Sequence, residues 1–257
     1  MGKEQEHIET VRKAEKLVER AMKGNDASHD AAHAFRVRDL ALSLANEEGL
    51  LSSPHSRLVV ELTALLHDIG QTILQKLVVR FLGFIHAVLT ELIFFAAGDH
   101  KYVREDSEEA TMVEKFLREE ELDESMKDSV LKIIKGMGFK DELAQCGFVD
   151  FPPEFGVVQD ADRLDAIGAI GIARCFTFGG SRNNVLHDPE IHPRLNVSKE
   201  QYVKGSEKRT TINHFHEKLL KLKDLMKTQA GKRRAERRHN FMQDFLTEFY
   251  EEWDGRA

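Results

Sequence analysis

Helical periodicity is the feature of this sequence that most constrains its fold. Apolar residues recur every three to four positions along most of the 257-residue chain, and only five prolines interrupt it. No stretch shows sustained alternation of apolar and polar residues, as a half-buried strand would. The pattern therefore predicts an all-α protein, folded as a single domain over residues 1–257.

The expected helices follow one another with short connections. The first carries apolar residues from Ile8 to Ala21, and Ser28 is expected to cap the second. The third runs through the leucines at 58, 62, 65 and 66. Further helices are expected near 104–121, 123–136, 155–174, 207–229 and 231–253. The segment 176–206 is rich in Gly, Asn, Asp and Pro, which predicts a long irregular loop before a C-terminal helical extension.

Composition and charge exclude several classes of function. The net charge is −7, whereas a nonspecific nucleic-acid binder needs a basic face. The basic run at 232–238 is interrupted by Glu236 and followed by acidic residues, which favours a solvated amphipathic helix. The two cysteines, Cys146 and Cys175, form no CxxC pair, so a cysteine zinc site is not expected. The N-terminus lacks the apolar stretch of a signal peptide, and we expect a cytoplasmic protein.

One apolar segment does not match its surroundings. Residues 71–98 are strongly apolar, and such a stretch raises the question of a membrane span. A span needs about 20 predominantly apolar residues. The uninterrupted part, 81–97, is shorter than this and carries His86 and Glu91. We therefore do not expect a membrane protein.

The doublet His67-Asp68 is the strongest chemical signal. It follows the apolar run Ala64-Leu65-Leu66 at the end of the third expected helix. Neutral imidazole and ionised carboxylate both donate lone pairs to a divalent cation. An ionisable pair directly after an apolar run is costly unless something compensates it, and a metal ion would do so.

His33 is the second signal. It lies four residues before Val37 and eight before Ala41, on the core-facing stripe of its helix. A lone histidine in this position is more often a hydrogen-bonded core residue than a ligand. The His67-Asp68 doublet one helix later shifts the interpretation toward a ligand.

The third signal is a group of carboxylates at the start of an apolar helix, Asp160, Asp162 and Asp165. Asp162 and Asp165 are three residues apart and share a face. Capping of a helix N-terminus explains Asp160 well. It explains Asp162 less well, because apolar residues flank that position on a helix expected to be buried.

Together these residues resemble the H…HD…D signature of the HD superfamily, and most closely a small bacterial and plant group of HD phosphohydrolases. The likeness covers nearly the whole chain outside 71–98. It rests on SHDAAH at 28–33, DHK at 99–101, VQDADRLDAIGAIGIA at 158–173 and TTINHFHEKLLKLKDLM at 210–226.

Two departures from the group stand out. Ala31 and Ala32 occupy positions that are usually tryptophan in the group. The relatives also run from HDIG directly into DHK, whereas 71–98 intervenes here. Removing it restores HDIGDHKY, and we hypothesise that the segment derives from a retained in-frame intron. A functional insertion is the alternative.

The resemblance implies one divalent metal ion, with Mn²⁺ first and Fe²⁺, Co²⁺, Ni²⁺, Zn²⁺ or Mg²⁺ as alternatives. Its implied ligands are His33, His67, Asp68 and Asp162, with Asp160 as the rival for the last place. Asp165 is expected to orient a ligand. Further catalytic candidates, besides Asp68 and Asp162, are His29, His100 and Lys101. Lys101, Lys140 and Arg163 are candidates for binding phosphate, whereas Lys218 and Lys221 are expected on a solvated helix face.

The implied function is a metal-dependent phosphohydrolase that acts on a nucleotide through a metal-activated water. Cleavage of a nucleoside triphosphate to monophosphate and pyrophosphate and hydrolysis of a monophosphate both remain open. Two other classes are a nucleotide-binding regulatory module, or inactive splice variant, and a protein anchored through 71–98 to a membrane or a partner helix. The oligomeric state is not predicted.

Overall fold

The computed structural model describes residues 2–69, 108–137, 151–194 and 210–257. Within these ranges the chain is helical, and the only β-type pairing is an isolated bridge between Val185 and Thr210. The all-α prediction is confirmed. In chain order the elements are α1 (Lys3–Ala21), α2 (Ala31–Glu47), η1 (Leu50–Ser52), α3 (Pro54–Leu66), α5 (Glu108–Glu119), α6 (Glu124–Gly136), α8 (Glu154–Asp165), α9 (Gly168–Ser181), α11 (Thr211–Glu217), η2 (Leu219–Leu225) and α12 (Gln229–Trp253).

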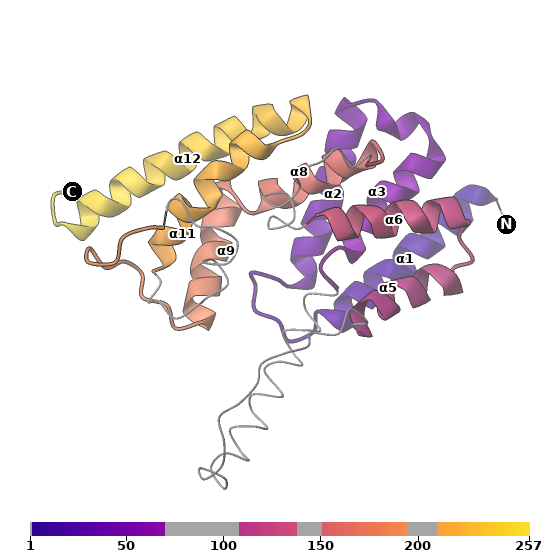
Figure 1. Cartoon of the computed structure of the whole chain (residues 1–257), viewed down its shortest axis with the longest axis horizontal. Coiled ribbons are helices and arrows are strands. Elements are labelled where there is room, and N and C mark those ends of the chain that lie inside the picture. The colour runs from indigo at the N-terminus through magenta and orange to yellow at the C-terminus, as the bar shows by residue number, and fades with distance from the viewer. Residues whose placement is uncertain (1, 70–107, 138–150, 195–209) are drawn as a thin grey trace, which may run out of the picture.

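Helix α3 is the centre of the N-terminal half. Every residue from Leu58 to Leu66 is buried, because α1, α2, α6 and α8 all pack against it. Figure 1 shows α1, α5 and α6 on one side of α8, and α9, α11 and α12 on the other. Helices α2, α3 and α8 therefore meet in the middle of the molecule, and α2 packs against both of the others.

The start of α2 differs from the sequence-based expectation. The side chain of Asp30, not Ser28, accepts a hydrogen bond from the backbone N–H of His33 and caps the helix. Ser28 lies in the preceding turn, where its hydroxyl contacts the carboxylate of Asp26 and the ring of His29. The earlier cap position was wrong because two polar residues compete for it and only the turn geometry decides between them.

The helix expected near 155–174 is in fact two helices. Helix α8 ends at Asp165 and α9 begins at Gly168, whose φ of +76° is a left-handed conformation that suits glycine. Arg238 of α12 crosses this break and donates a hydrogen bond to the carbonyl of Leu164, a terminal carbonyl of α8. Tertiary packing thus stabilises a break that the apolar periodicity does not reveal.

Two further helix boundaries differ from those predicted from the sequence. Helix α9 continues to Ser181, so its last residues lie inside the loop expected at 176–206. The single helix expected near 207–229 is α11 followed by the 3-10 helix η2, with the change at Lys218. The segment 71–98 lies outside the described residues. Among the residues that are described, no helix is long and apolar enough to cross a membrane.

Candidate metal centre

His33 projects from the first turn of α2 into the core. Its side chain is fully buried, as are those of Val37 and Ala41 on the same face. The Asp30 cap holds the backbone of His33 at the helix start. The apolar stripe therefore fixes which way the imidazole points.

His67 and Asp68 follow the last residue of α3. His67 keeps right-handed helical backbone angles, and its Nδ1 lies 2.8 Å from the carbonyl oxygen of Ala64. A ring nitrogen facing a carbonyl is the donor, so His67 carries its proton on Nδ1 and presents the Nε2 lone pair. Both residues are buried, and they directly follow the buried stretch of α3 from Leu58 to Leu66.

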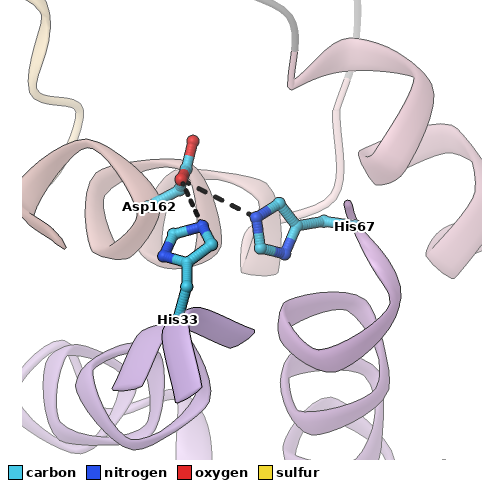
Figure 2. A group of neighbouring side chains, drawn as sticks. All are labelled: His33, His67 and Asp162. Carbon is cyan, nitrogen blue, oxygen red and sulfur yellow. Dashed lines mark ion pairs between the residues drawn. The ribbon is translucent and has the colours of Figure 1, made fainter. Parts of the chain in front are cut away.

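Asp162 reaches the same point from α8. Its Oδ1 lies 3.5 Å from Nε2 of His33 and 3.7 Å from Nε2 of His67 (Figure 2). Ligand atoms of these three residues all lie within 4.8 Å of one another. Oδ2 of Asp68 is 3.3 Å from Nε2 of His33 and 3.6 Å from Nε2 of His67. The structure thus brings together all four residues that the resemblance implied as ligands.

These groups fit a metal ion. The Nε2 atoms of His33 and His67 are buried and have no hydrogen-bond partner, which is costly unless something else uses their lone pairs. Two ligand bonds of about 2.1 Å that meet at 90° to 110° place the ligand atoms about 3.0 to 3.4 Å apart. The observed separations are close to this range. Two orphaned nitrogens facing two carboxylates are a donor set that could hold a divalent cation.

Asp165 fixes the orientation of His33. Its Oδ2 lies 2.8 Å from Nδ1 of His33, so His33, like His67, offers Nε2 to the cluster. Arg36 holds the Asp165 carboxylate with two hydrogen bonds of 2.9 and 3.0 Å, and Arg174 adds a third of 3.0 Å. The expectation that Asp165 orients a ligand agrees with these contacts.

Electrostatics in the cluster favour a bound cation. Burial opposes protonation of His33, but the three carboxylates around it outweigh this and raise its pKa to about 10. The pKa of His67 is also raised, because nearby Asp68 and Asp162 outweigh its burial. Burial would raise the pKa of Asp68, yet the charge of His67 and contact with His33 lower it to about 2. The pKa of Asp162 falls well below its usual value, since the two histidines outweigh burial. A divalent ion would therefore replace protons on the imidazoles.

The cluster opens on the side of Asp162. The side chain of Asp162 is 33% exposed, whereas those of His33 and His67 are 1% and 3% exposed. A small molecule or water would therefore approach past Asp162. The buried histidines form the floor of the site.

Asp160 lies on another face of α8 and serves another purpose. Its carboxylate accepts hydrogen bonds from the backbone N–H groups of Lys227 and Thr228 and from the Thr228 hydroxyl, at 2.7 to 2.8 Å. It is fully buried and anchors the start of α12. The prediction that Asp160 caps the start of its own helix is wrong, because α8 begins at Glu154 and the Asp160 carboxylate instead binds the segment that leads into α12. The structure brings Asp162, not Asp160, to the histidines.

The other predicted site residues differ in what the structure shows. His29 lies beside the cluster, with its ring 6.4 Å from that of His33. Burial lowers its pKa, against the opposing charge of Asp68. Arg163 is buried and donates to the carbonyl of Leu225 at 2.5 Å, so at least part of its guanidinium ties α8 to η2. The remaining candidates, His100, Lys101 and Lys140, lie outside the described residues.

Sequence reasoning missed Lys218 and Arg174. Lys218 is partly buried instead of solvated, and burial lowers its pKa while the charges of Asp162 and Asp68 oppose this shift. The helical spacing could have predicted the partial burial of Lys218, because it stands three residues after Phe215 and four before Leu222, both core residues. The same spacing argument had singled out His33. Arg174 sits nine residues after Asp165, and only the break between α8 and α9 brings it back to that carboxylate.

Comparison with known proteins identifies the family of this chain. Residues 30–167 match the HD domain family. The uncharacterized protein YpgQ of Bacillus subtilis is 30% identical over 251 residues, which are 96% of this chain and 97% of YpgQ. The chain therefore belongs to the HD domain family.

Solved structures agree over nearly the full length. A protein of Lactobacillus plantarum superposes with a TM-score of 0.73 at 28% identity, covering 96% of this chain and 98% of that one. An HD-superfamily hydrolase of Bacillus thuringiensis has a TM-score of 0.62 at 32% identity, with the same coverage. Bacillus subtilis YpgQ in complex with ADP has a TM-score of 0.61 at 25% identity, covering 96% of each chain.

Proposed function

We propose that this chain is a metal-dependent phosphohydrolase that acts on a nucleotide, with one divalent ion held by His33, His67, Asp68 and Asp162. The observation that carries the proposal is the pair of buried, unpartnered Nε2 atoms facing two ionised carboxylates. Two imidazoles and two carboxylates suit Mn²⁺, with Fe²⁺, Co²⁺, Ni²⁺, Zn²⁺ and Mg²⁺ as alternatives. A bound ion would activate water and neutralise charge that develops on phosphate.

The chain's own residues supply orientation and charge. Hydrogen bonds at both Nδ1 atoms fix the tautomers, so the imidazoles need no rearrangement to bind the ion. The exposed edge of Asp162 gives the reacting phosphate a way in. The carboxylates of Asp68 and Asp162 stay ionised at neutral pH, because their pKa values are depressed. These features serve hydrolysis at phosphorus, where positioning and electrostatic stabilisation contribute most.

A nucleotide is the proposed substrate class. The ADP complex of the related YpgQ supports it, since the two chains align over nearly their whole length. Cleavage of a triphosphate to monophosphate and pyrophosphate is the reaction we favour, with monophosphate hydrolysis as the alternative. His29, neutral near pH 7 by its lowered pKa, is the proposed proton carrier. Phosphate binding by His100, Lys101, Lys140 and Arg163 stays a prediction.

The test is hydrolysis of a nucleotide panel with Mn²⁺ by the full chain and by a form lacking residues 71–98. His67→Ala and Asp68→Asn should abolish turnover. Matched controls are His55→Ala and Asp128→Asn, because both side chains are exposed and distant in sequence from the cluster. Product formation by the full chain, lost in the two cluster variants and kept in the controls, supports the proposal.

Other outcomes separate the rival functions. Activity only without 71–98 would make this chain an inactive variant of an active enzyme. Metal and nucleotide binding without turnover in either form would favour a regulatory module. Transcript sequencing tests the intron hypothesis, which fails if every mature message encodes 71–98. Fractionation of cells that express the full chain tests an anchoring role for the segment.

A further inference from the structure

One face of α9 leads away from the metal cluster. Arg174, Phe178 and Arg182 are spaced four residues apart, so they follow one another along this face, with Arg182 directly after the last residue of the helix. Arg174 donates hydrogen bonds to the carboxylate of Asp165 at 3.0 Å and to the backbone carbonyl of Ser28 at 2.8 Å. The face therefore begins beside the cluster and runs along the turn that precedes α2.

Phe178 meets His29 one turn further along this face. The centroids of the two rings are 5.8 Å apart, and their planes meet at 63°. The His29 ring lies 6.4 Å from the ring of His33, and its Nδ1 is 2.7 Å from the hydroxyl oxygen of Ser28. Two ring contacts thus separate Phe178 from a proposed metal ligand.

Exposure increases along the same face. The side chain of Arg174 is 12% exposed, Phe178 is partly exposed, and Arg182 is exposed. The guanidinium carbon of Arg182 lies 5.2 Å from the centroid of the Phe178 ring. A cation–π contact at an exposed site is weak, so a flat ligand can replace it or add to it at little cost.

The order of groups on this face matches the order of groups in a nucleotide. In a nucleotide the sugar separates the charged phosphates from the flat base. In the structure His29 separates the charged cluster from the partly open ring of Phe178. Aromatic rings and guanidinium planes are the groups on which proteins stack bases.

We propose that Phe178, with Arg182 beside it, stacks against the base of a nucleotide whose phosphates lie at the metal cluster. This inference rests on the proposed nucleotide substrate, but not on turnover. It assigns to α9 the recognition of the part that distinguishes a nucleotide from an inorganic phosphate. The nucleotide sugar would then lie beside His29.

The test compares two ligands at saturating Mn²⁺ by calorimetry, α,β-methylene-ADP and methylenediphosphonate. They share the same two phosphorus groups and differ by the nucleoside, and their bridging carbon resists hydrolysis. Phe178→Ala should weaken binding of the nucleotide analogue about fivefold or more, as expected for loss of one stacking contact, and leave methylenediphosphonate and Mn²⁺ affinity unchanged. Phe178→Tyr keeps the ring and should restore most of the affinity.

Two further variants complete the design. Arg182→Met should weaken the nucleotide analogue by a smaller factor and leave methylenediphosphonate unchanged, because the guanidinium is placed beside the base and not at the phosphates. The matched control is Phe241→Ala, which removes an exposed phenylalanine of α12 and should match the parent chain for both ligands.

Several results would overturn the proposal. An unchanged affinity for the nucleotide analogue in Phe178→Ala would do so. An equal loss for both ligands would show that Phe178 acts only by holding His29 and the cluster in place. A parent chain that binds the nucleotide analogue no better than methylenediphosphonate has no base subsite, whereas the metal site would stand. If the Phe178 effect is found but no nucleotide is hydrolysed, the hydrolase proposal fails and the base subsite stands.

Discussion

Replacing Asp165 with asparagine should weaken both the fold and the metal site. The Asp165 side chain is 5% exposed, and its carboxylate accepts four hydrogen bonds: one from His33, two from Arg36 and one from Arg174. The amide of Asp165→Asn carries no charge and offers one acceptor oxygen in place of two. Two guanidinium groups and an imidazole would then lose the carboxylate that they share.

The magnitude follows from these contacts. Removing one partner of a buried ion pair costs about 3 to 5 kcal/mol. Arg36 is partly solvated, with 36% of its side chain exposed, so water compensates part of its loss and the lower end applies. We expect a loss of about 3 kcal/mol, which lowers the Tm by about 6 to 12 °C in a chain of this size. Because His33 also loses its orienting acceptor, Mn²⁺ affinity should fall about 10- to 100-fold.

The assay combines thermal unfolding of the metal-free chain with calorimetric titration of Mn²⁺. Asp128→Asn, an exposed carboxylate on α6, is the matched control and should change neither quantity. A Tm within 2 °C of the parent would contradict the ion-pair argument, since a loss of about 3 kcal/mol in unfolding free energy should lower the Tm by more than this. Unchanged Mn²⁺ affinity would contradict the orienting role of Asp165, whatever the stability.

Four other predictions test separate parts of the structure. The pKa of His33 is raised to about 10, and metal binding needs a neutral imidazole. Mn²⁺ affinity should therefore rise with pH between about 6.5 and 10, and each binding event should release protons from the protein to the buffer. A flat profile of Mn²⁺ affinity from pH 6 to 8.5 would refute this. For the metal-free chain, the raised pKa means that protonated His33 stabilises the fold fully below about pH 6.5, and urea titrations should show that contribution declining as pH rises through about 10. Asp160→Ala should cost about 3 kcal/mol in stability by leaving buried N–H groups at the start of α12 unpaired, yet keep Mn²⁺ affinity, whereas Asp162→Asn should do the reverse; similar effects of the two variants on Mn²⁺ binding would be inconsistent with the assigned roles. Gly231→Ala places a methyl group 2.2 Å from Oδ2 of Asp160 and should lower the Tm without altering Mn²⁺ binding; an unchanged Tm would mean that the α8–α12 contact adapts more easily than the packing indicates.

The sequence by itself determined the class of fold and the ligand candidates. Helical periodicity is a local property of the chain, because each apolar residue reports the face of its own helix. That is why His33 could be assigned to a core-facing stripe, and why His67-Asp68 after an apolar run signalled a buried ionisable pair. Both conclusions needed only spacing and the cost of burying charge.

Only the tertiary structure decided how these residues act together. The choice between Asp160 and Asp162 depends on which face of α8 meets α2 and which meets α12, and two residues of separation do not reveal that. The prediction that Lys218 lies on a solvated helix face was wrong, because the packing of α11 and η2 leaves this residue only partly exposed. Arg174 reaches Asp165 only because the helix is interrupted near Gly168, between α8 and α9. Contacts between residues far apart in sequence arise from how helices pack, and this information is not contained in the periodicity of any single helix.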